Sequence, residues 1–276
     1  MPEMKKSNSV LLSTPYLIWM VVFTLIPLGV VGYYALTDPA TGEFTWANML
    51  NLGMYLPVLW QSIAYSLVSA FICLLLGYPV AYYIAHRSEV MQKILYMLVM
   101  LPMCMSFLLR TLAWVGLLQD TGIINDFLEW IGIGRIQLIR TPGAVILGMV
   151  YNYLPYMILP LYSTIVKIDG RLIEAAEDLG CTPVQTFRKV TLPLSMPGIL
   201  SGITMVFVPA VSTFYISQKL GGTDTVLIGD VIERLFKQGN NANLGAALSL
   251  VLMILVFVCT GIMNRFGADE EGGVIV

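Results

Sequence analysis

The sequence predicts an all-helical membrane protein with six transmembrane helices. Of its 276 residues, 57% are hydrophobic and only 12% are charged, about half the charged share of an ordinary soluble domain. The mean hydropathy of +0.79 agrees with this class. Each span needs about 20 helical residues to cross a bilayer. The stretches that meet this length cover residues 14–36, 57–85, 94–118, 142–166, 194–217 and 244–263.

The first stretch has two alternative interpretations. Lys5 and Lys6 precede it, as positive charges precede the apolar core of a signal peptide. Its apolar part is longer than such a core, and no small-residue cleavage site follows. We therefore expect a retained first helix. Residues 1–60 are then a cytoplasmic N-terminus, this helix and an outer loop.

Five prolines fall inside these apolar stretches. Neighbouring helices in a membrane protein can satisfy the backbone groups that a proline frees. We therefore expect kinks in the helices and no gaps. The prolines concerned are Pro27, Pro79, Pro102, Pro155 and Pro209.

The distribution of Lys and Arg predicts the orientation, because cytoplasmic connections carry the excess of positive charge. With the N-terminus inside, the larger inner set is Lys5, Lys6, Arg87, Lys93, Lys167, Arg171, Arg188, Lys189 and Arg265. The smaller outer set is Arg135, Arg140, Lys219, Arg234 and Lys237. Both termini, the tail at residues 265–276 and the charged loop at residues 167–193 are thus expected in the cytoplasm.

The sequence lacks the motifs of the common energy-converting and metal-dependent enzymes. It contains no Gly-Lys dipeptide, and hence no phosphate-binding loop of the Walker type. Its single histidine, His86, excludes an H-E-x-x-H zinc site, and its four cysteines form no C-x-x-C pair. We expect no catalytic residue, metal or cofactor. Any energy source must come from another chain.

The charged loop at residues 167–193 predicts two short helices joined at a sharp corner. Asp169 can cap the first helix, and Gly180 can end it in a left-handed conformation. The second helix begins with a capping box at Thr182 and Gln185 around Pro183. The first helix carries an apolar stripe made by Leu172, Ile173, Ala176 and Leu179. The second helix has an apolar face made by Phe187 and Val190. By helix composition alone, the loop could be an amphipathic hairpin that only covers the ends of the spans.

Particular spacings in this loop resemble the EAA loop of the membrane subunits of ATP-binding-cassette importers. Glu174-Ala175-Ala176 is followed after three residues by Gly180. The apolar Leu192-Pro193 pair lies two positions later than in the family pattern. The resemblance implies the type-I importer fold, with a transmembrane domain over residues 61–264. It also implies a coupling helix that docks on a separate ATPase dimer through Glu174, Ala175, Ala176, Gly180 and Pro193.

Three further segments are similar to the B-type permeases of spermidine/putrescine importers. They are LLRTLAWVGLLQDTGIIN, GMVYNYLPYMILPLYSTIVKID and STFYISQKLGGTDTVLIGDVI. This resemblance implies a polyamine substrate, the bacterial inner membrane, a second, C-type permease chain and an extracytoplasmic polyamine-binding protein. Permeases for sulfate, molybdate, thiamine and ferric iron share the same loop and span plan. Import of an anion such as sulfate, or of another small solute, is thus the alternative.

Polar and aromatic residues inside the spans are candidate walls of a substrate pathway. Tyrosine and tryptophan faces attract alkylammonium groups, each by about 0.5–2 kcal/mol. The candidates are Trp114, Asn152, Tyr156, Ser212 and Tyr215. Arg110 is also a candidate, because a charge inside a membrane span is a functional hypothesis by default. Arginine repels a polyamine, so Arg110 either snorkels outward, pairs with an acidic residue, or faces an anionic substrate.

Carboxylates are absent from the centres of the spans and lie in the expected outer loops. Asp120, Asp224 and Asp230 could form an acidic mouth that attracts a cation and docks a binding protein. A rival interpretation is a membrane enzyme that uses Asp120, Asp126 and Glu129, but their helical spacing is poor for a shared site. A proton-coupled carrier is a second rival. The lack of carboxylates within the spans argues against it.

Overall fold

The computed structural model describes residues 15–38, 41–237 and 241–271. Among these residues, five helices are long and apolar enough to cross a membrane, and a bent helix pair supplies a sixth crossing when it is counted as one span. The described residues divide into two compact units. One takes in residues from Met1–Leu56 and Val231–Ile254, and the other residues from Pro57–Asp230 and Leu255–Val276.

The first unit is held together by small side chains and by two asparagine amides. Its helices are α2 (Ile26–Ala35), α3 (Ala47–Leu50) and the parts of α14 (Ile228–Lys237) and α15 (Ala242–Glu271) that fall within it. Ala35, Ala246 and Ala247 are fully buried in its core. The Asn48 and Asn243 side chains both donate to the Thr37 carbonyl, at 2.9 and 2.6 Å.

A π-helix at Val21–Leu25 precedes α2 and explains how the first span accommodates Pro27. The Ile26 N–H donates to the Val21 carbonyl, five residues back. Proline lacks an N–H and its ring clashes with the carbonyl four residues back, and a π-turn is one way to relieve that clash. The first expected span is therefore one irregular helical segment, Pro15–Ala35.

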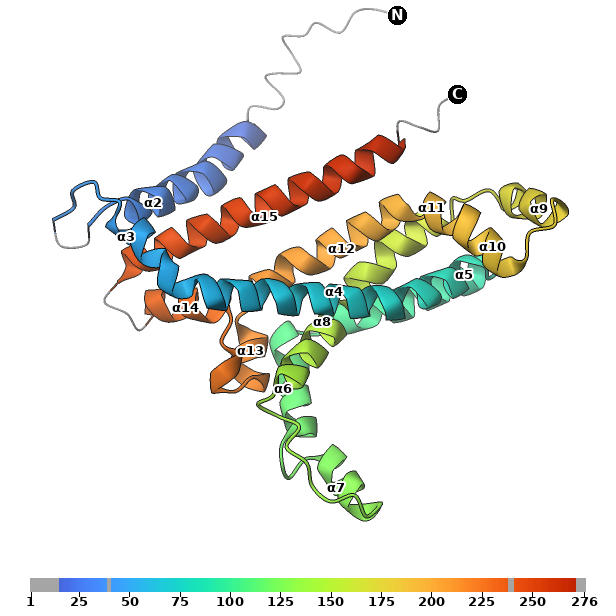
Figure 1. Ribbon diagram of the computed structural model, residues 1–276, viewed down its shortest axis with the longest axis horizontal. Helices are drawn as coiled ribbons and strands as arrows, with labels where there is room; N and C mark the ends of the chain where they lie inside the picture. The colour runs from blue at the N-terminus through green and yellow to red at the C-terminus, as the bar shows by residue number, and fades with distance from the viewer. Residues whose placement is uncertain (1–14, 39–40, 238–240, 272–276) are drawn as a thin grey trace, which may run out of the picture. The chain divides into compact units, whose positions relative to one another are not determined.

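The second unit contains the other spans and the charged loop (Figure 1). Its N-terminal half is made of α4, α5, α6, α7 and α8, and its C-terminal half of α9 to α13. Their bounds are α4 Leu56–Ala85, α5 Glu89–Met100, α6 Phe107–Leu118, α7 Ile123–Trp130, α8 Pro142–Ile165, α9 Gly170–Asp178, α10 Pro183–Thr186, α11 Leu192–Leu194, α12 Met196–Val211 and α13 Tyr215–Leu220.

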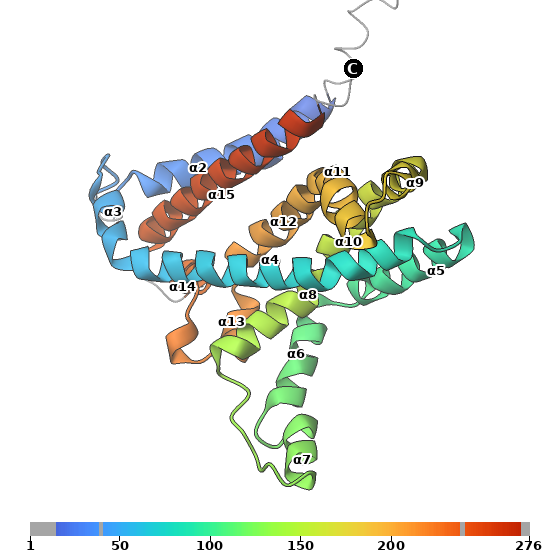
Figure 2. The ribbon, with the colours of Figure 1, turned by 45° about the vertical axis from the view of Figure 1, so that its right-hand side comes forward.

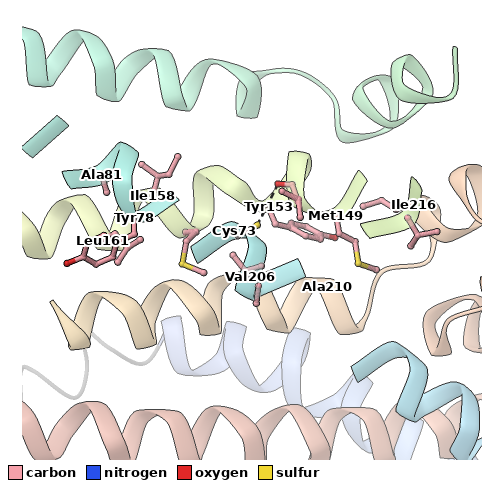
Figure 3. Packing of buried hydrophobic residues seen from close by; sticks show 14 of the residues in the cluster. Cys73, Tyr78, Ala81, Met149, Tyr153, Ile158, Leu161, Val206, Ala210 and Ile216 are labelled. Carbon is pink, nitrogen blue, oxygen red and sulfur yellow. Dashed lines mark hydrogen bonds between the residues drawn. The ribbon is translucent and has the colours of Figure 1, made fainter. Parts of the chain in front are cut away.

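The core of this unit lies between α4, α8 and α12, as Figure 3 shows for Cys73, Met149 and Val206. Among the described helices, α8 and α12 have the most extensive mutual contact, and glycines lie in their interface. A Cβ atom at Gly198 would lie 2.8 Å from the Cβ of Thr164. Small residues at such positions let membrane helices approach each other and gain van der Waals contact.

The third expected span, residues 94–118, is interrupted, which corrects the expectation of a kink at Pro102. The helix α5 ends at Met100, a 3₁₀ turn covers Leu101–Cys104, and Met105 is extended with ψ 149°. A new helix, α6, starts at Phe107. Pro79, Pro155 and Pro209, in contrast, lie inside continuous helices as expected.

At the C-terminal end, the last helix is longer than the sequence suggested. Some residues at both ends lie outside the described part of the chain. The helix α15 continues to Glu271, past the boundary of 264 expected for the transmembrane domain. The expected cytoplasmic residues Lys5 and Lys6, and the last residues of the tail, 272–276, lie outside the described part of the chain.

Candidate functional site

The loop at residues 167–193, which we call the coupling loop, begins with the short helix α9. The Asp169 carboxylate caps this helix by accepting from the Arg171 N–H at 3.0 Å. Gly180 follows the helix with a φ of +82°. Both features were expected from the sequence and are confirmed. Figures 1 and 2 place α9, α10 and α11 together at the end of α8.

The second half of the loop starts with the expected capping box. The Thr182 N–H donates to Gln185 Oε1 at 2.9 Å, and the Gln185 N–H donates to Thr182 Oγ1 at 3.4 Å. The helix then passes through a π-helix, Phe187–Thr191, which the proline at position 193 follows. The segment Pro183–Leu194 meets α12 at an angle of 63°. The two expected short helices joined at a corner are therefore present, and the second one leads through this bend into α12.

Aromatic contacts anchor the coupling loop to α4. The Phe187 ring packs edge-on against the rings of Tyr78 and Tyr82, with centroid distances of 5.6 and 6.2 Å. The Tyr78 hydroxyl lies 2.9 Å from Ser195 Oγ at the bend. Neither Tyr78 nor Ser195 belongs to a motif, so the spacing of residues in the sequence does not reveal them. Their role depends on the approach of α4 to a segment more than 100 residues away.

The coupling loop presents both polar and apolar side chains at its surface. Glu174, Ala175, Gly180 and Pro193 are exposed, whereas Ala176 is buried. The expected apolar stripe of α9 is only partly buried, because Leu172 is 48% exposed and Leu179 is 86% exposed. The coupling loop therefore exposes apolar side chains as well as charged ones.

The aromatic candidates of the spans lie on helices that contact one another. The helices α6, α8 and α13 pack together pairwise. Trp114 of α6 lies edge-on to Tyr151 of α8 at 5.3 Å, and Tyr156 lies 6.4 Å from Tyr153 on the same helix, α8. The ring of Tyr215 already forms a cation–π contact within the chain, because Lys219 Nζ lies 5.7 Å from its centroid.

The polar candidates differ in accessibility. Ser212 is exposed at the end of α12, where its hydroxyl donates to the Val208 carbonyl at 3.2 Å. Asn152 is 1% exposed, and its Nδ2 donates to the Gly148 carbonyl at 2.9 Å. Asn152 Oδ1 is buried and accepts no hydrogen bond from the described residues. Asn152 therefore belongs to the packed interior of the unit in this state.

Arg110 is buried, with 7% of its surface exposed, so outward snorkelling does not describe it. Its Nε and Nη1 atoms are buried and donate no hydrogen bond to any described residue. The nearby Tyr153 hydroxyl donates to the Pro209 carbonyl at 3.3 Å. Within the described residues, Arg110 forms no ion pair with a carboxylate.

The outer acids do not all belong to one exposed mouth. Asp120 and Asp224 are exposed, and the Asp224 carbonyl accepts from Gln61 Nε2 at 2.8 Å. Asp230, in contrast, is 4% exposed, and its Oδ2 accepts from the Leu227 N–H at 2.9 Å. Asp230 thus stabilises the start of α14, and its place in an exposed acidic mouth is not supported.

Two of the three residues of the rival enzyme interpretation, Asp126 and Glu129, are engaged in exposed ion pairs. Arg135 contacts Asp126 at 3.2 Å and Glu129 at 2.9 Å. The described residues contain no cluster of three or more side chains that could hold a metal ion. Asp126 and Glu129 therefore do not form a free carboxylate pair.

Comparisons with known proteins show the family and the fold of the chain. Residues 74–268 match the model of the family described as binding-protein-dependent transport system inner membrane component. The spermidine/putrescine transport system permease protein PotB of Salmonella typhimurium (strain SL1344) is 39% identical over 247 residues, which is 86% of each chain. PotB of Escherichia coli (strain K12) is 38% identical, with 86% of this chain and 90% of that relative covered. A bacterial ABC transporter that imports the acidic polysaccharide alginate has a chain of the same fold, with a TM-score of 0.75, 20% identity and 96% of each chain covered.

Proposed function

The chain belongs to the family of inner membrane components of binding-protein-dependent transport systems, and we propose that it forms the translocation path of a polyamine importer. It is a permease subunit, not an enzyme. Its ATPase is a separate chain, and its substrate arrives on a binding protein. The observation that carries the proposal is the exposed coupling loop at the end of a helical unit whose relatives are polyamine permeases.

The coupling loop is the proposed contact with the ATPase. Glu174 supplies an exposed charge, and Ala175 allows close approach because its side chain is small. Gly180 supplies the turn, and Pro193 sets the π-helix and the bend that leads into α12. The buried Ala176 holds α9 against the unit. A push on the loop is then transmitted through Phe187 to α4 and through the 63° bend to α12.

A polyamine is the proposed substrate, and aromatic side chains are its proposed contacts. The Tyr215 ring holds the ammonium group of Lys219 at 5.7 Å, which is the kind of contact an alkylammonium ligand would form. Trp114 and Tyr156 offer further partly exposed rings. Ser212 offers an exposed hydroxyl, and Asn152 a buried carboxamide oxygen without a hydrogen bond from the described residues.

Arg110 is proposed to form an ion pair with an acidic group of a second permease chain. A buried guanidinium without hydrogen-bond partners is unfavourable, and truncating one partner of a buried pair usually costs about 3–5 kcal/mol. An ion pair would also neutralise the positive charge of Arg110, which would otherwise repel a cationic substrate in the path. The second chain, of the C-type, would supply carboxylates that this chain lacks in its spans.

The proposed orientation places both termini, residues 265–276 and the coupling loop in the cytoplasm. The outer face then includes Asp120 and Asp224, which would attract the cation and contact the binding protein. The transmembrane domain proper is proposed to extend over residues 61–264, with residues 1–60 as a peripheral segment.

The test is ATP hydrolysis by the complex of this chain with its co-purifying partners in lipid. Binding protein loaded with spermidine or putrescine should stimulate hydrolysis, whereas protein offered sulfate or thiamine should not. Stimulation by sulfate would overturn the substrate assignment and would make Arg110 a contact for an anion. Hydrolysis without any response to a loaded binding protein would count against the whole assignment.

A further inference from the structure

The helix α7, Ile123–Trp130, exposes a row of large apolar side chains. Ile123, Phe127 and Trp130 are 70%, 58% and 81% exposed. They lie at positions i, i+4 and i+7, which share one face of a helix. The rings of Phe127 and Trp130 pack against each other, with their centroids 5.9 Å apart. The proposed function uses none of these three residues.

Another side of α7 is fixed to the rest of the second unit. Asn125 is fully buried, and its Nδ2 donates to the Gln119 carbonyl at 3.3 Å. The Asn125 Oδ1 accepts from the Ile136 N–H at 3.0 Å. Ile124 packs against the hydrophobic core of the unit. These contacts determine which side of α7 faces the protein, so the exposed row is a defined surface of the fold.

The charged side chains of α7 lie beside the apolar row, on one flank of the helix. Asp126 and Glu129 both pair with Arg135, at 3.2 and 2.9 Å, and the three side chains are 46–59% exposed. Charged groups are unfavourable at the centre of a bilayer, so this flank does not belong in the hydrocarbon. Water around the whole helix would in turn leave three large apolar side chains hydrated. The boundary between hydrocarbon and water suits both sets of side chains.

A tight turn holds α7 at the end of α6. Only residues 119–122 separate the two helices, and the Gly122 N–H donates to the Gln119 carbonyl at 2.8 Å. A Cβ atom at Gly122 would lie 2.6–2.8 Å from three backbone carbonyl oxygens, so a larger residue does not fit in this turn. Figures 1 and 2 both show α7 beyond α6 and apart from α4 and α12 of the same unit. The position of α7 in the membrane therefore depends on where α6 ends.

The apolar surface of α7 continues the exposed apolar surface of α6. Leu108, Leu109 and Leu112 of α6 are exposed, and α6 and α7 together are long and apolar enough to be counted as one membrane span. Side chains that are exposed on a membrane span contact acyl chains. Tryptophan is enriched where the hydrocarbon ends, because its ring is apolar and its N–H is a hydrogen-bond donor. A lipid surface is therefore the partner that this row of side chains fits.

We propose that α7 is an interfacial helix that binds the phospholipid headgroup region of the leaflet in which α6 ends. Ile123, Phe127 and Trp130 contact the first segments of the acyl chains, and the ion pairs of Arg135 face the headgroups and water. This contact holds the end of α6, and with it Arg110, at a fixed depth in the bilayer. The inference requires only that the chain spans a membrane. It depends neither on the substrate nor on the proposed orientation.

The experiment measures the depth of α7 in the complex of this chain with its co-purifying partners, reconstituted in phospholipid vesicles. A nitroxide label is attached at Ile123→Cys, in a background in which every native cysteine except the buried Cys73 is replaced by serine. Asp126→Cys on the charged flank is the matched control, and it leaves the pair of Glu129 with Arg135 intact. Dissolved oxygen concentrates in hydrocarbon, whereas a neutral nickel chelate stays in water. Oxygen should relax the label at position 123 more strongly than the nickel chelate does, and the order should be reversed at position 126.

Trp130 provides a second measurement that needs neither a label nor a new cysteine. The difference in emission between the wild type and Trp130→Phe isolates the fluorescence of this residue from that of the other tryptophans. Lipids that carry bromine near the headgroup end of their acyl chains should quench this fluorescence more strongly than lipids brominated near the chain ends. Phenylalanine keeps an aromatic ring in the row, so the variant complex should assemble like the wild type.

Three results would overturn the inference. If neither reagent reaches the label at position 123 and neither lipid quenches Trp130, a protein chain covers this face of α7. If the nickel chelate relaxes the label at position 123 as strongly as the label at position 126, the face lies in water. If lipids brominated near the chain ends quench Trp130 most, α7 lies within the hydrocarbon as part of a span. None of these measurements requires uptake or ATP hydrolysis, so failure of the proposed function would leave them interpretable.

Discussion

Replacing Gly198 by alanine should destabilise the packing of α8 against α12. The added Cβ would lie 2.7 Å from Thr164 Oγ1, 2.8 Å from the Cβ of Thr164 and 3.0 Å from the Pro160 carbonyl oxygen. Carbon atoms in contact prefer about 3.5–4.0 Å, so the helices must separate by most of an ångström. The Pro160 carbonyl oxygen belongs to the backbone and the Thr164 Cβ is bonded to it, so a change of side-chain rotamer cannot relieve these two contacts. Overpacking of this kind costs about 1–3 kcal/mol.

Gly116→Ala is the matched control, because no atom lies within 4 Å of a Cβ at that helical position. Alanine improves the helix propensity by about 1 kcal/mol at both sites. Gly116→Ala should therefore be neutral or stabilising, and the difference between the two variants isolates the cost of the clash. Thr164→Gly combined with Gly198→Ala should be less destabilised than the sum of the single changes.

Cys73 offers the reporter for this prediction. Its thiol is fully buried in α4, 3.7 Å from the Val150 carbonyl of α8. With Cys104, Cys181 and Cys259 replaced by serine, a thiol-reactive fluorophore in detergent reports only the opening of this core. Gly198→Ala should lower the midpoint temperature of labelling relative to Gly116→Ala. Equal midpoints would refute the view that Gly198 sets the distance between α8 and α12.

Two further predictions concern the coupling loop. Gly180→Ala should reduce binding-protein-driven uptake while ATP hydrolysis persists, because a φ of +82° costs a residue with a Cβ about 1–2 kcal/mol. Gly180→Asn and Gly170→Ala should be milder, and equal uptake by all three variants would exclude this backbone requirement. Tyr78→Phe removes the 2.9 Å hydrogen bond to Ser195 and should cost about 0.5–1.5 kcal/mol. Faster amide hydrogen exchange in residues 187–195 would show it, and unchanged exchange would contradict it.

The local structure of the coupling loop could be predicted because it depends on neighbouring residues. Asp169, Gly180 and the Thr182–Gln185 capping box act within a few residues of their own positions. The interruption of the third span, in contrast, could not be predicted from neighbouring residues. Pro102 was one of several prolines in apolar stretches, and only the tertiary packing distinguishes it from Pro79, which stays inside a continuous helix.

The sequence by itself determined the class of protein, the approximate spans and the position of the coupling loop, because length, apolar composition and short-range capping are properties of contiguous segments. The tertiary structure decided which polar groups are buried. It placed Asp230 and Arg110 in the interior and left Leu179 and Trp130 exposed. Burial depends on residues that are distant in the chain and meet only after folding, so spacing alone could not reveal it.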